Sequence, residues 1–136
     1  MPAALLCLIA LAFVACGGER SFDAEEFVGE LNDHGAGLAL EGSLPNEQAG
    51  VEVYSVAIAA NPGEGEDDHS GEGGHSGGSL VVADDGDGAI AEHERCEGAV
   101  SFICFRAANA VLIVEDGSRP QDIERVGAAI RALESD

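Results

Sequence analysis

The side chains best suited to chemistry lie in one glycine-rich stretch, residues 61–78. It contains two imidazoles and five carboxylates, and the candidate ligands among them are His69, His75, Asp67, Asp68 and Glu72. Imidazole nitrogens and carboxylate oxygens are ligands for divalent ions such as Zn²⁺, Ni²⁺ and Cu²⁺. A stretch of this composition cannot form a core, so we expect a disordered loop that binds a metal only weakly, because binding must order it. The alternative is a solvated low-complexity loop with incidental histidines.

The N-terminal stretch carries information on the cellular location of the chain. Residues 3–14 are uninterruptedly apolar. This run has the length of a signal-peptide core and is shorter than the roughly 20 residues that a membrane-spanning helix needs. It leads into Ala12-Phe13-Val14-Ala15-Cys16-Gly17-Gly18. Small residues before a cysteine that is followed by two glycines resemble the bacterial lipobox.

The resemblance implies that residues 1–15 are a removable signal peptide and that Cys16 is lipidated and becomes the first residue. Residues 16–21 would then tether the rest of the chain to the cell membrane, on its extracytoplasmic face. The alternatives are an ordinary secretory signal and an unprocessed anchor.

The remaining cysteines predict a disulfide. Cys7 would leave with the signal peptide and Cys16 would carry lipid, so Cys96 and Cys104 remain. Outside the cytoplasm, a pair this close in sequence is most simply a disulfide, and closing so short a loop stabilises the fold by about 2.5 kcal/mol. Two alternatives stay open. The thiols are buried and free, or they bind a soft metal with His93 and His34.

Two motifs resemble known sites but do not fit them. Residues 74–78 read Gly-His-Ser-Gly-Gly and match the G-x-S-x-G pattern of hydrolases, but that pattern requires a sharp turn between a strand and a helix. Here it lies in a glycine-rich loop before an expected strand. Residues 84–88 read Asp-Asp-Gly-Asp-Gly, yet Cys96 occupies the twelfth position from Asp85, where a calcium loop needs a glutamate. An acidic turn before a helix explains this second motif better.

The charge of the chain limits its partners. Six Arg, no Lys and 26 acidic residues give a net charge of -20. Nucleic acid binding needs a basic surface, which this composition does not supply, so we exclude nucleic acid as a partner. The charge favours solubility and cationic partners.

The hydrophobic pattern predicts a single small domain over residues 22–136. We expect helices at 24–34 and 89–97 and a third helix opened by a Ser118 to Gln121 capping box. Strands are expected at 38–41, 51–59, 79–83, 100–105 and 110–115, the last two forming a hairpin in the centre of the sheet. The predicted fold class is therefore α+β, a mostly antiparallel sheet of about four to five strands covered by about three helices, with one disulfide.

These patterns favour a lipid-anchored, non-enzymatic domain with a binding or structural role in the cell envelope. Its expected partners are the membrane, through the lipid, and a protein or a cation. Weak metal capture by the His69 and His75 loop is the alternative. An enzyme is the third possibility, and it would require a pocket that gathers His34, His93 or Tyr54 with acids.

Overall fold

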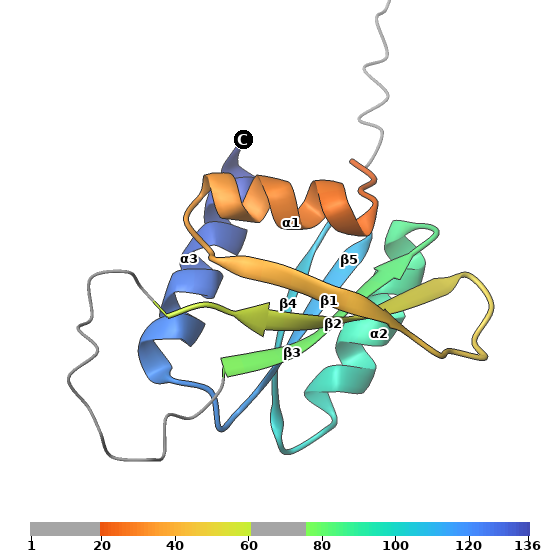
Figure 1. The fold of residues 1–136 in the computed structure, drawn as a ribbon. Helices are drawn as coiled ribbons and strands as arrows, with labels where there is room; N and C mark the ends of the chain where they lie inside the picture. The colour runs from red at the N-terminus through yellow and green to blue at the C-terminus, as the bar shows by residue number, and fades with distance from the viewer. Residues whose placement is uncertain (1–19, 61–75) are drawn as a thin grey trace, which may run out of the picture.

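The computed structural model describes residues 20–60 and 76–136. The elements follow one another as α1 (Ala24–Asp33), β1 (Leu38–Leu44), β2 (Val51–Ile58), β3 (Ser76–Ala83), α2 (Gly86–Glu97), β4 (Phe102–Ala107), β5 (Ala110–Glu115) and α3 (Pro120–Ser135) (Figure 1). The predicted α+β class and the predicted order of elements are confirmed. The predicted signal peptide and Cys16 lie outside the described residues.

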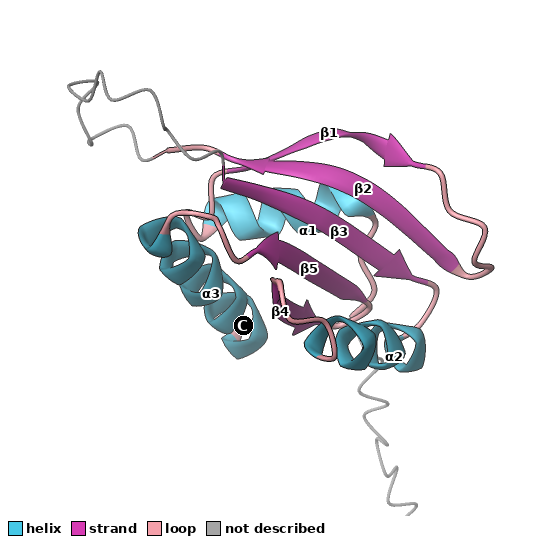
Figure 2. Cartoon of the chain, turned by 90° about the horizontal axis from the view of Figure 1, so that it is seen from below, coloured by secondary structure: helices cyan, strands magenta, loops and turns pink. Residues whose placement is uncertain are grey.

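All strand pairs of the sheet are antiparallel, in the order β1-β2-β3-β5-β4. Helices α1 and α3 pack on one face of this sheet, over a core that includes Phe27, Leu80 and Leu112. Helix α2 packs on the other face, where Ala89 contacts a smaller cluster around Val81 and Val111 (Figure 2). The hairpin of β4 and β5 was expected in the sheet centre, but β4 is an edge strand and β3 is the central one.

Helix α1 begins as its sequence predicts. The side chain of Asp23 accepts a hydrogen bond of 2.8 Å from the backbone N–H of Glu26, which satisfies one of the free donors of the first turn. The rings of Phe22 and Phe27 pack edge to face with centroids 5.6 Å apart. Gly35 follows the helix with a φ of 85°, a conformation that glycine adopts without strain.

Strand β3 begins three residues earlier than predicted, so the expected loop at 61–78 is wrong at its C-terminal end. Ser76 pairs with Ile58 of β2, and Gly78 pairs with Val114 of β5. Glycine is required at position 78, because a Cβ there would lie 1.8 Å from the carbonyl oxygen of Ile113. Glycine, read as a loop signal, here permits the close approach of two strands.

The helix boundaries also differ from the prediction. Helix α2 begins at Gly86 because Asp85 caps it, accepting 2.7 Å from the backbone N–H of Gly88. Helix α3 has no Ser118 capping box. Its N-cap is Arg119, which makes no side-chain cap bond, and the Ser118 hydroxyl instead accepts from the backbone N–H of Gly77 at 3.4 Å. A tertiary contact therefore takes the place of the local one.

The predicted disulfide is present. Cys96 at the end of α2 is bonded to Cys104 of the edge strand β4, with the two Cα atoms 6.1 Å apart. Among the described residues, no helix has both the length and the apolar character needed to cross a membrane.

Candidate functional site

The predicted metal ligands His69, His75, Asp67, Asp68 and Glu72 lie outside the described residues. The structure does define where their segment joins the fold. Ile58 at the end of β2 is paired with Ser76 at the start of β3. The segment therefore leaves the sheet and returns to it at one place.

A cleft of about 630 Å³ lies at that place. Small residues on paired strands line it, with Ala57 of β2 opposite Gly77 of β3 and Ser55 nearby. Exposed Glu41 and Glu115 also line the cleft. It forms because this part of the sheet carries small side chains, whereas the apolar residues that α2 contacts lie farther along the same face.

One wall of the cleft is built on a buried carboxylate. The side chain of Asp122, in the first turn of α3, has no exposed surface. Its Oδ2 accepts hydrogen bonds of 2.7 Å from the hydroxyl of Ser76 and 2.7 Å from Nε of Arg119. The Ser76 hydroxyl in turn accepts from the backbone N–H of Arg119 at 3.0 Å. Ser76 and Arg119 both line the cleft.

Arg125 completes this buried network on its other side. Its Nη1 lies 3.1 Å from Oδ1 of Asp122. The two atoms form an ion pair, but their geometry is not that of a hydrogen bond. Its Nε donates to the carbonyl of Ala36 at 3.0 Å, and its Nη2 donates to the carbonyl of Ala59. This network consists of Ser76, Asp122, Arg119 and Arg125. It joins the start of α3 to the residues on either side of segment 61–75.

The hydroxyl of Ser76 is held in a structural contact within this network. The Ser76 hydroxyl donates directly to Asp122, whose charge is balanced by two guanidinium groups. In the described part of the chain, no imidazole lies between the serine and the acid, as it would in a serine nucleophile activated by a histidine base. The hydrolase-like motif at residues 74–78 therefore places its serine at the start of a strand, in a structural contact.

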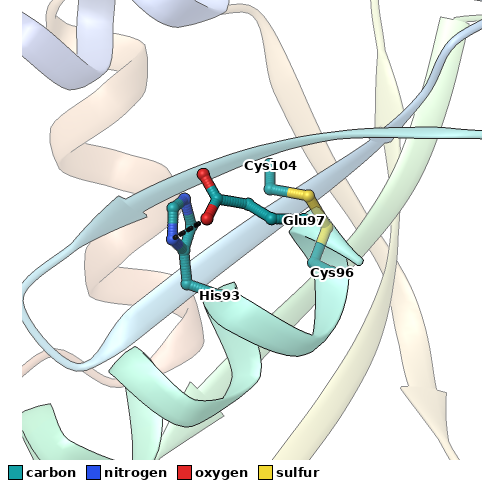
Figure 3. Close-up of a disulfide and its surroundings, with 4 residues drawn as sticks. All are labelled: His93, Cys96, Glu97 and Cys104. Atoms are coloured by element: carbon teal, nitrogen blue, oxygen red, sulfur yellow. Dashed lines mark ion pairs between the residues drawn. A yellow bond between two sulfur atoms is a disulfide. The ribbon is translucent and has the colours of Figure 1, made fainter. Parts of the chain in front are cut away.

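The alternative to the disulfide, a soft-metal site at Cys96 and Cys104, does not form. Cys96 and Cys104 are bonded to each other, so neither sulfur is a free thiolate ligand. Figure 3 shows His93 beside this disulfide, where its Nδ1 lies 3.8 Å from Oε2 of Glu97. Within residues 20–60 and 76–136, no three His, Cys, Asp or Glu side chains are grouped to hold a metal.

The three side chains considered for an enzyme are not gathered in one pocket. His34 at the end of α1 pairs with Asp136, with Nε2 2.9 Å from Oδ2, whereas His93 lies on α2. Tyr54 of β2 donates its hydroxyl to Oε2 of Glu52 at 3.0 Å. That hydrogen bond, followed by partial burial and nearby carboxylates, raises the pKa of Tyr54.

Sequence reasoning missed the residues that the fold brings together at the cleft. A signal for Asp122 exists, since it precedes Val126 by one turn on the buried stripe of α3, with arginines three residues before and after it. An acid in an apolar stripe, flanked by arginines at helical spacing, indicates a buried ion pair. For Glu41 and Glu115 no local signal exists.

Comparisons with protein families, with curated proteins and with solved structures find no match for this chain.

Proposed function

We propose that this chain is a lipid-anchored domain on the extracytoplasmic face of the cell membrane, with a non-enzymatic binding or structural role in the cell envelope. The sequence around Cys16 supports the lipid. The observation that carries the proposal is how soon after Cys16 the folded domain begins.

Phe22, six residues after Cys16, is already part of the core. Its backbone N–H donates to Oδ1 of Asn109 at 2.7 Å, and its carbonyl accepts from Nδ2 of the same side chain at 2.9 Å. The segment between the lipid and the domain is therefore short, as in a domain built to be held at a membrane surface.

The cleft is the candidate binding surface. Glu41 and Glu115 line it, in a chain of net charge -20. Such a field attracts cations and repels anions, so the supported partner is a protein with a basic segment, or a small cation. Purified domain that turned over a substrate, with activity lost on one polar-to-alanine change, would contradict the non-enzymatic role.

The lipid anchor is tested by substitution in cells. We expect the Cys16→Ser protein to lose incorporation of a palmitate analogue and to leave the membrane fraction. The Cys7→Ser protein is the matched control and should behave as the parent, because Cys7 departs with the signal peptide. Cys16→Ser protein that stays in the membrane fraction as the parent does would exclude the anchor.

Metal capture through residues 61–75 is the second candidate function. The pairing of Ile58 with Ser76 favours it, because it holds the ends of the segment together and so reduces the chain entropy that metal binding must remove. A metal at a hundred times its dissociation constant should stabilise the fold by about 2.7 kcal/mol if it binds only the folded state.

Thermal unfolding with Zn²⁺, Ni²⁺ or Cu²⁺, beside a direct titration of each metal, tests this second function. The double variant His69→Ala/His75→Ala should lose both the stabilisation and the binding. His93→Ala, on α2, should keep both. Binding that the double variant retains would place the metal elsewhere.

A further inference from the structure

The surface that a lipid anchor would hold against the membrane can be identified from the way the N-terminus joins the fold. Arg20 is the first described residue, four residues after Cys16. A fully extended chain of that length reaches only about 14 Å. Arg20 is itself held, with its guanidinium 4.9 Å over the ring of Phe22 and 3.4 Å from Glu30.

Asn109 fixes this attachment at one end of the central strands. Its side chain binds the backbone of Phe22 and also donates to the carbonyl of Ala83, the last residue of β3, at 2.9 Å. Ala110 begins β5 beside it. The C-terminal turn of α3 reaches the same end, where Glu134 and Asp136 line a hollow with Arg20 and Phe22. We call this region the Asn109 end.

The cleft lies at the opposite end of the same two strands. β3 begins at Ser76 and β5 ends at Glu115, and both residues line the cleft. Seven residue steps separate Ser76 from Ala83, which at the rise of a strand corresponds to about 23 Å. In Figure 1 the start of α3, which the buried network ties to the cleft, likewise lies far from the start of α1.

We propose that the anchored domain stands on the bilayer with the Asn109 end toward the lipid and the cleft directed away from it. This inference rests on the proposed lipidation of Cys16. The short tether holds the Asn109 end near the surface, and the acidic surface of the domain keeps the remainder from lying flat on an anionic membrane. A partner would therefore meet the cleft from the extracytoplasmic space.

Energy transfer from an introduced tryptophan to a fluorescent lipid headgroup tests this orientation. The chain has no tryptophan of its own, so each variant reports one position. Glu134→Trp places the donor at the Asn109 end, and Glu115→Trp places it at the cleft. Both positions are exposed, and each change removes one negative charge, so the two variants are matched. The full lipidated chain is reconstituted in vesicles of phosphatidylcholine and anionic phosphatidylglycerol that carry a dansyl headgroup lipid.

We expect transfer from Glu134→Trp to exceed that from Glu115→Trp by about twofold or more, because about 23 Å of strand separates the two ends. Inserting 20 Gly and Ser residues between Gly18 and Glu19 should reduce this difference, since such a linker spans about 25 Å on average. Equal transfer from the two variants, or stronger transfer from Glu115→Trp, while both stay bound to vesicles would overturn the orientation. Failure of both to bind vesicles would mean that the anchor is wrong, and the orientation would fall with it. Cys16→Ser versions of both should show no transfer.

Discussion

At the scale of single residues, Tyr54 is a reporter supplied by the chain itself, because it is the only tyrosine. Its hydroxyl donates to Glu52, and this bond is the main cause of its raised pKa. We predict that its ultraviolet titration occurs above pH 10.0, the ordinary value, and that Glu52→Gln lowers the midpoint. Glu41→Gln, which removes a charge that does not act on Tyr54, is the control and should leave the midpoint unchanged.

The sign of the pH effect on stability follows from that shift. The pKa is higher in the folded chain, so the contribution of Tyr54 to the free energy of unfolding is present below the pKa of the unfolded chain. It is lost as the pH rises through the folded pKa. Stability of the parent should therefore fall in alkaline solution more steeply than that of Glu52→Gln. Equal slopes in urea unfolding series would show that the Glu52 bond does not act on folding.

Replacing Asp122 should lower the free energy of unfolding more than replacing its neighbours in the network. Asp122→Asn leaves the guanidinium groups of Arg119 and Arg125 without their buried counter-charge, and breaking a buried pair costs about 3 to 5 kcal/mol. We expect the lower end of that range, because the Arg119 side chain is 32% exposed. Urea unfolding measures the loss. Ser76→Ala removes a neutral hydroxyl that donates to Asp122 and accepts from the backbone N–H of Arg119, and should cost less, about 1 to 2 kcal/mol. Exposed Asp87→Asn should change stability by less than about 0.5 kcal/mol.

At the scale of elements, two glycines should respond oppositely to the same substitution. Gly78→Ala would drive a Cβ into the backbone of Ile113 and disturb the pairing of β3 with β5, so it should destabilise the fold strongly. Gly29→Ala, in the middle of α1 with no atom within 4 Å of its Cβ, should stabilise by about 0.5 to 1 kcal/mol. Unfolding midpoints of both variants in urea test this. A neutral Gly78→Ala would mean that β3 and β5 are not paired as described.

The disulfide joins two elements that otherwise meet at the edge of the sheet. Replacing both cysteines, Cys96→Ser/Cys104→Ser, should lower the free energy of unfolding by about 2.5 kcal/mol, because the open chain has more conformations when unfolded. Hydrogen exchange should increase most in α2 and β4, the elements that the bond connects. If exchange rises evenly over the whole sheet, the disulfide stabilises the fold globally, which would contradict a local effect on α2 and β4.

At the scale of the whole molecule, the net charge of -20 opposes folding by self-repulsion. Raising NaCl from about 0.01 M to 0.15 M shortens the screening length from about 30 Å to about 8 Å. We predict that the urea midpoint rises over this range and rises equally in choline chloride. A rise confined to Ca²⁺ or Mg²⁺ at the same ionic strength would instead indicate a bound divalent cation.

The helices and strands could be predicted from the sequence wherever they depend on interactions between residues close in the chain. The Asp23 cap, the contact of Phe22 with Phe27, the apolar run at residues 110–115 and the nearby cysteines act over a few residues or lie on periodic patterns. These determined the fold class, the order of elements and the disulfide.

The tertiary structure decided what depends on neighbours distant in sequence. Ser76 and Gly78 have the composition of a loop, yet pairing with β2 and β5 makes them a strand. From its position in the sequence, Asp122 is an ordinary acidic residue in the first turn of a helix. Its burial with Arg119 and Arg125 depends on how α3 packs against the sheet. The cleft and its position opposite the Asn109 end arise from the strand order, because only the order β1-β2-β3-β5 places Glu41, Ser76 and Glu115 together. Local propensity carries no information about that order.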